Sequence, residues 1–136
     1  MTTIADVRTQ MATAAVVADG LQRCHPYLLD KIVPPCAEIT TLPRDPRMVL
    51  SKAKAPYRFV ITVYVDRTSE RAGQELLDTF AEPTGATSLT EAIEAEANWG
   101  TVDVDYVTVT DISGISEVEL AGSKYLIERF IVEVCW

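Results

Sequence analysis

The sequence predicts an α+β domain, with helices packed on one face of a mostly antiparallel β-sheet. Three observations support this fold class. An amphipathic helical pattern opens the chain, an apolar strand occupies residues 57–66, and alternating strand patterns run from about residue 102 to the C-terminus. The chain has 136 residues, of which 48% are apolar and 24% charged, as is typical of one globular domain. We therefore expect a single domain over residues 1–136, with an N-terminal helix and two further helices.

The N-terminal segment is expected to form the first helix, over about residues 3–20. Thr2 or Thr3 is placed to cap its start, and Gly20 is a plausible stop. Its apolar residues recur at steps of three and four, as one face of a helix requires: Ile4, Val7, Met11, Ala14, Val17 and Leu21.

A proline-rich stretch separates this helix from the central strand. Pro26, Pro34 and Pro35 exclude a long regular element before a short strand expected at residues 36–40. Residues 41–56 then form a proline-rich loop, which is the only basic segment of an acidic chain. We expect charged residues of this loop to contact a second subunit or a partner: Arg44, Asp45, Arg47, Lys52 and Lys54.

Residues 57–66 give the clearest strand pattern. Both of its faces are largely apolar, so we expect a central strand that is covered on both sides. The predicted core combines this strand with residues of one helix and of the last strand: Phe59, Ile61, Val63, Leu76, Phe80, Phe130 and Val132.

Two helices are expected after the central strand. Thr68 or Ser69 caps the first, and the second begins at Ser88. Ser88 and Glu91 have the spacing of a capping box, in which each side chain bonds to the backbone amide of the other residue. This second helix should end near Trp99. The first helix presents an apolar stripe: Ala72, Leu76 and Phe80.

The remainder of the chain is predicted to be β-structure. Gly114 and residues 121–123 are typical of hairpin turns, and the last strand runs over about residues 124–136. In the strand that begins near residue 102, apolar and polar residues alternate: Val102, Val104 and Tyr106 with Asp103, Asp105 and Thr108.

Few residues are candidates for catalysis. His25 is the only histidine and follows a helix in a turn, so any triad would depend on it. With His25, the thiols Cys24, Cys36 and Cys135 match no common zinc spacing, and we interpret them as reduced structural thiols whose further role is open. The glycines form no phosphate-binding loop. We therefore expect no catalytic residue, no metal and no cofactor.

The net charge limits the kinds of partner that the chain can bind. The chain carries a formal charge of −8, which argues against a nucleic-acid-binding surface over the whole protein and against attachment to an anionic membrane. The N-terminus lacks the pattern of a secretory signal, and no apolar run is long enough to span a bilayer. We expect a soluble protein that is made in the cytoplasm.

Two segments carry a family resemblance: residues 71–78 followed by 83–92, and the ending 125–134. Together with the order of strand, helix, Pro/Gly turn, short helix and C-terminal strands, they resemble the tail terminator proteins of long-tailed, non-contractile bacteriophages. The resemblance covers about residues 32–136. The run at 48–55 and the cysteines depart from it.

The resemblance implies a structural virion protein. Such proteins form a ring, usually a hexamer, that caps the tail tube and joins it to the head–neck connector, and DNA passes through the ring without sequence-specific binding. It implies a place at the tail–neck junction of the virion after synthesis in the host cytoplasm. In such a ring, four acids on the polar sides of the C-terminal strands are candidates to face the channel, where like charge keeps DNA mobile: Asp103, Asp105, Glu117 and Glu119.

Two alternatives stay open from the sequence. The first is another neck component, such as a head-completion or stopper protein, because neighbouring ring proteins share size and acidity. The second is a small α+β enzyme or ligand-binding module. It would use the Asp103 and Asp105 face, with Tyr57, Tyr64 and Tyr106 as pocket walls, although such alternating acids are more often the solvated side of a strand.

Overall fold

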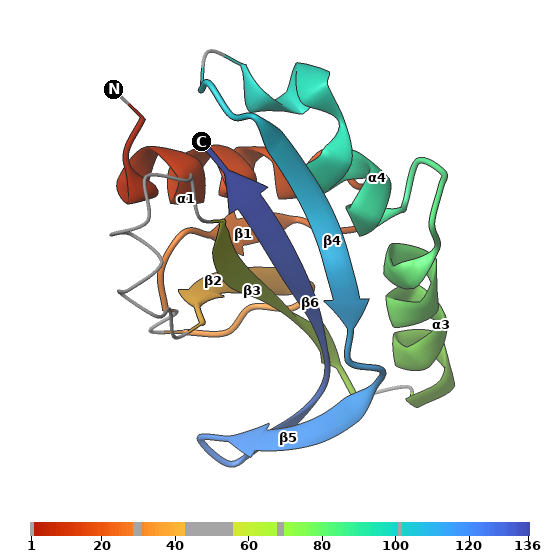
Figure 1. The fold of residues 1–136 in the computed structure, drawn as a ribbon. Coiled ribbons are helices and arrows are strands. Elements are labelled where there is room, and N and C mark those ends of the chain that lie inside the picture. The colour runs from red at the N-terminus through yellow and green to blue at the C-terminus, as the bar shows by residue number, and fades with distance from the viewer. Residues whose placement is uncertain (1, 29–30, 43–55, 68–69, 101) are drawn as a thin grey trace.

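The computed structural model describes residues 2–28, 31–42, 56–67, 70–100 and 102–136. Within them a six-stranded sheet has the order β1–β2–β3–β6–β4, and β5 also pairs with β6 (Figure 1). All strand pairs are antiparallel except β1 with β2. The strands are β1 (Arg23–His25), β2 (Cys36–Thr41), β3 (Tyr57–Asp66), β4 (Tyr106–Ile112), β5 (Ser116–Leu120) and β6 (Ser123–Cys135).

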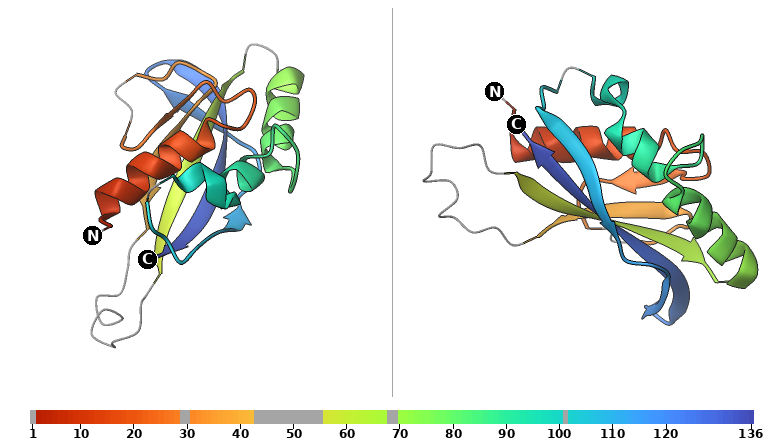
Figure 2. Two further views of the ribbon diagram at one scale, coloured as in Figure 1. Left: turned by 90° about the horizontal axis from the view of Figure 1, so that it is seen from above. Right: turned by 45° about the vertical axis from the view of Figure 1, so that its right-hand side comes forward.

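The helices confirm the predicted fold class. Those described are α1 (Ile4–Ala15), α3 (Glu70–Ala81), α4 (Leu89–Glu94) and the short 3-10 helix η1 (Glu96–Trp99). Figure 2 shows the twisted sheet from two further directions, with the hairpin of β5 and β6 extending away from the end that holds the two termini. No helix in the described part of the chain has the length and apolar character needed to cross a membrane.

Helix α1 begins as predicted and ends earlier. The Thr3 hydroxyl accepts a hydrogen bond from the Asp6 amide (3.2 Å), and the Asp6 carboxylate accepts one from the Thr3 amide (2.8 Å). The helix stops at Ala15 instead of near residue 20, and turns carry the chain on to Gly20, whose φ is +94°. Because it lies past the helix, Val17 is 53% exposed and does not join the buried face.

The core lies between the helices and one face of the sheet. β3 is buried from Phe59 to Val65 and pairs along its length with β6, where Ile61 lies opposite Phe130. All predicted core residues are fully buried except Leu76, which is partly buried. The core also includes large side chains that are not in the predicted core list: Val7, Met11, Ile39, Leu77, Leu89, Ile93 and Trp99.

The predicted stripe of α3 is turned by one position. Ala72 is exposed, whereas Gly73 and Leu77 face the sheet together with Phe80. The reason is the close approach of the helix: a Cβ at position 73 would lie 2.9 Å from the Leu126 Cδ1. A glycine therefore allows α3 to sit directly on the strands.

The start of α4 differs from the predicted capping box in one half. Ser88 caps the helix as expected, since its hydroxyl accepts from the Glu91 amide at 3.0 Å. The Glu91 carboxylate, however, accepts from the Gly85 amide, while the Ser88 amide donates to the Gly85 carbonyl oxygen at 3.1 Å. The helix then breaks at Ala95, whose extended backbone separates α4 from η1.

Strand β4 begins at Tyr106, later than predicted. The chain bends at Asp105, so the alternation of the preceding residues does not continue into the strand. Val107 and Val109 lie opposite Val134 and Val132 and pack against the core. The Tyr106 side chain is consequently 43% exposed instead of facing the core.

The second face of the sheet carries a smaller cluster. Cys36, Tyr64 and Ile127 are buried there, and Val118 of β5 packs against them. The β5–β6 turn closes this side with Ala121 and Gly122, both at positive φ, as a two-residue type I′ turn requires. The central strand is therefore buried on both faces, as predicted.

Candidate interaction surfaces

The basic loop predicted as a contact lies outside the described residues. Arg44, Asp45, Arg47, Lys52 and Lys54 all fall within residues 43–55. Their part in assembly stays a prediction.

The four predicted channel-facing acids are all exposed and lie in two separate pairs. Asp103 and Asp105 precede β4, and the Asp105 amide donates to the Cys135 carbonyl oxygen at 2.7 Å. Glu117 and Glu119 lie on β5.

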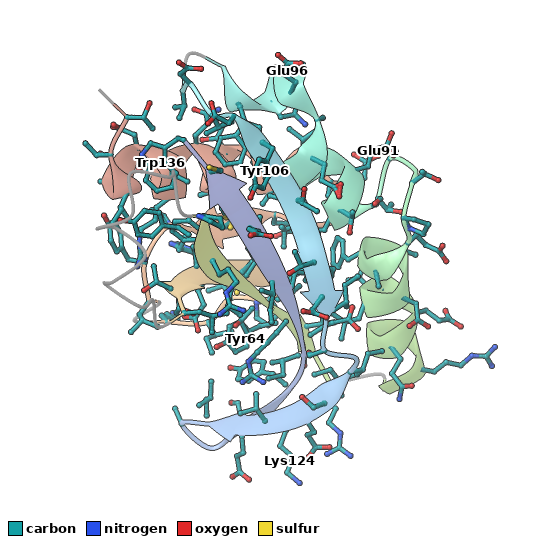
Figure 3. All side chains as sticks on the ribbon, in the orientation of Figure 1. Tyr64, Glu91, Glu96, Tyr106, Lys124 and Trp136 are labelled. Carbon is teal, nitrogen blue, oxygen red and sulfur yellow. The ribbon has the colours of Figure 1, made fainter. Side chains whose placement is uncertain are left out.

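The two acidic pairs are far apart along β6. β4 begins opposite Cys135, whereas β5 lies opposite the beginning of β6, near Leu126. At about 3.3 Å per residue, the two positions are about 30 Å apart along the strand. Figure 3 shows Tyr106 at one end of the molecule and Lys124 at the other. The four acids thus do not form one surface, and the exposure of either pair to a channel stays a prediction.

Glu117 is also engaged in ion pairs. Its Oε1 lies 3.1 Å from the Arg67 Nη1 and 3.8 Å from the Lys124 Nζ. These pairs join β5 to the end of β3 and to β6. They partly neutralise the acid that was expected to face DNA.

The three tyrosines considered as pocket walls point to different places. Tyr57 stacks on Trp136 with ring centroids 4.7 Å apart. Tyr64 lies on the opposite face of β3, where its hydroxyl donates to the Glu38 Oε1 at 2.7 Å. Burial, followed by the hydrogen bond to Glu38, raises the pKa of Tyr64 above its ordinary value. Tyr106 lies on β4, so the three side chains do not line one pocket.

The cysteines are free thiols in two regions of the sheet. Cys24 and Cys36 lie on the neighbouring strands β1 and β2, whereas Cys135 ends β6 on the other side of β3. Burial raises the pKa of Cys24 to about 12, which keeps this thiol protonated and unreactive at neutral pH. Within the described residues, no three His, Cys, Asp or Glu side chains are grouped so that they could hold a metal.

A groove of about 420 Å³ runs between α1 and β1, and we call it the β1 groove. Apolar side chains of Ala12, Val16 and Pro26 contribute to its walls, and Arg23 is an exposed cation beside them. None of the described residues that line it is acidic. They are Thr9, Ala12, Thr13, Val16, Arg23, Cys24, His25 and Pro26.

Arg8 braces one rim of the β1 groove. Its Nη1 donates to the Pro26 carbonyl oxygen at 2.9 Å and to the Ile39 carbonyl oxygen at 3.1 Å. Its guanidinium also lies 4.7 Å from the centre of the Tyr27 ring, as a cation–π contact requires. Beyond this braced turn, Tyr27 and Leu28 are 54% and 72% exposed, so the rim is both held in place and apolar.

A second hollow, of about 300 Å³, opens between η1 and β4, and we call it the β4 hollow. Its buried wall is Trp99, whose indole N–H donates to the Ile93 carbonyl oxygen at 2.8 Å. The residues that line it include three acids and no basic residue. The full lining is Glu94, Glu96, Trp99, Val104, Asp105, Tyr106 and Val107.

The two hollows lie at opposite edges of the sheet, because β1 and β4 are the first and last strands in its order. Of the residues that line the β4 hollow, sequence reasoning named Asp105 and Tyr106 as parts of a possible ligand site. It missed the β1 groove. The available signal was the pair Tyr27 and Leu28, which are apolar residues next to a proline that fit neither a helical nor a strand pattern. Their exposure, and the role of Arg8 in holding the turn, depend on the parallel pairing of β1 with β2.

Comparisons with known proteins leave the family open. No protein-family model matches the chain, and no curated protein matches it either.

Proposed function

We propose that this chain is a tail terminator of a long-tailed, non-contractile bacteriophage. It forms a ring, the hexamer typical of that family, which caps the tail tube and joins it to the head–neck connector. DNA passes through the ring without sequence-specific binding. The role is structural, and the protein acts at the tail–neck junction of the virion after synthesis in the host cytoplasm.

The observation that carries this proposal is that the surfaces at the two edges of the sheet differ in polarity and charge. A ring is built from heterologous contacts, in which one patch on each subunit meets a different patch on the next. The β1 groove is apolar with a basic residue, whereas the β4 hollow is acidic. Surfaces of this kind support head-to-tail association. The sequence resemblance over residues 32–136 supplies the specific family.

The acidity of the chain agrees with a passage for DNA. A net charge of −8 disfavours tight binding to phosphates, which requires clustered Lys and Arg. DNA that must move through the ring passes more easily if the channel wall does not bind its phosphates. The partners of the ring are then proteins: the tail tube protein on one side and the connector or stopper protein on the other.

The location of the protein in the virion tests the proposal. An epitope tag on this chain, carried by an infectious phage, should place immunogold label at the junction of head and tail. Label spread along the whole tail would indicate a tube protein instead. Virions without label, although the tagged protein is expressed, would exclude a virion role.

A further inference from the structure

We propose that the β4 edge of one copy docks into the β1 groove of a second copy. The β4 edge consists of strand β4 and the lining of the β4 hollow. This inference rests on the proposed function, because it names the subunit contact of the proposed ring. Three independent features of the described residues support it: an open strand, an apolar groove and complementary charge.

The open strand is β4. Among the described residues, only β6 pairs with it, so its outer edge has no strand partner. An edge strand of seven residues offers unpaired backbone groups and is usually protected from other chains. Here it instead carries two exposed apolar side chains, Tyr106 at 43% and Ile112 at 39%. Such an edge is suited to cover by another protein surface.

The β1 groove can receive an aromatic side chain. Ala12, Val16 and Pro26 give it apolar walls, and Tyr27 and Leu28 extend the apolar surface at its rim. Tyrosines that enter a pocket on a partner are frequent anchors of protein interfaces. Tyr106 is the exposed aromatic residue of the β4 edge. It is therefore the side chain that we place in the groove of the neighbouring copy.

Charge selects which surfaces meet. Arg23 lines the β1 groove, and Arg8 lies behind its rim. Glu94, Glu96 and Asp105 surround the β4 hollow. Contact between two β4 edges would bring acids against acids, and such like-charge contacts disfavour association. Contact between an edge and a groove brings acids to a cation, so a head-to-tail arrangement is favoured.

Photocross-linking of the full-length chain tests this contact. We would replace Tyr106 by the photoreactive analogue p-benzoylphenylalanine, which keeps an aromatic ring at an exposed position. Irradiation at about 1 mM protein captures contacts with dissociation constants in the millimolar range or below. We expect intermolecular cross-links that map by mass spectrometry to residues 9–16 or 23–28 of the second copy.

A matched pair of variants at Thr13 supplies the charge test. Thr13 is exposed on α1 and lines the groove. In the chain that carries the probe, Thr13→Glu should lower the yield of cross-linked dimer at least about fivefold relative to Thr13→Lys, because only the acid repels the β4 edge. The same probe at Leu120, on the far hairpin, should not label the groove. Circular dichroism verifies that each variant is folded.

Three results would overturn the inference. They are cross-links from position 106 to β4 of the second copy, cross-links to any other surface outside the groove and its rim, or folded protein without intermolecular cross-links. The proposed function fails separately. If a phage that lacks the gene still makes tails of normal length, the protein is not a terminator. That result would not change the cross-links expected between two copies of the chain.

Discussion

Glu128 is a buried acid without a compensating partner. It is 3% exposed, and its Oε1 has no hydrogen-bond partner in the described structure. Its side chain faces the helices, since it lies opposite Val63 on β3. Burial is the main cause that raises the pKa of Glu128 to about 7, and Asp78 of α3 adds repulsion. The folded protein therefore favours the protonated acid.

This environment predicts a pH-dependent stability. The pKa of Glu128 is about 7 in the folded protein, above its ordinary value of 4.5. The stability that protonated Glu128 contributes is therefore fully present below about pH 4.5, and it is lost as the pH rises to about 7. We expect Glu128→Gln to raise the free energy of unfolding by about 1–3 kcal/mol at pH 8. At pH 4.5 the difference should fall below about 0.5 kcal/mol. Urea denaturation at both pH values measures it.

Glu82→Gln is the control, because Glu82 is an exposed acid just after α3. It should change stability by less than about 0.5 kcal/mol at both pH values. A Glu128→Gln protein that is less stable than the wild type at pH 8 would contradict the account. It would mean that the ionised carboxylate has a stabilising partner.

At the scale of the element, local pattern predicted most of the fold. The strands β2 and β3 and the cap of α4 follow from alternation, apolar runs and the Ser88 side chain. The end of α1 did not follow, because Val17 and Leu21 continue the helical period after the helix has stopped. Leu21 is indeed buried, but from the segment between α1 and β1, whereas Val17 is exposed. The helical period therefore extends beyond the helix and does not mark burial at every position.

The pairing of β3 with β6 predicts where the stability is concentrated. Phe80 of α3 and Phe130 of β6 are both fully buried. Replacing either by Ala should lower the free energy of unfolding by about 3–5 kcal/mol, through lost burial and the cavity left behind. Urea denaturation measures this loss, with Leu120→Ala at a 38% exposed position as the control. Losses below about 1 kcal/mol at both phenylalanines would place the core elsewhere.

At the scale of the whole molecule, the interaction surfaces depend on long-range order. The sequence indicated the strands other than β1, because it placed His25 in a turn, whereas the structure has residues 23–25 as a strand. It also did not indicate that β6 lies between β3 and β4, or that β1 pairs in parallel with β2. Those two pairings make β1 and β4 the edge strands of the sheet, and they therefore determine where the β1 groove and the β4 hollow lie. The registers of β4 and β5 along β6 separate Asp103 and Asp105 from Glu117 and Glu119, which the sequence analysis had grouped because they lie on the polar sides of the C-terminal strands.

We propose that this protein stops the growth of a phage tail. Electron microscopy of particles from a strain that lacks the gene tests it most directly, with the gene supplied in trans as the control. We expect abnormally long tails, which return to normal length on complementation. Filled heads without tails, beside free tails of normal length, would contradict the claim and assign the protein to the head side of the neck.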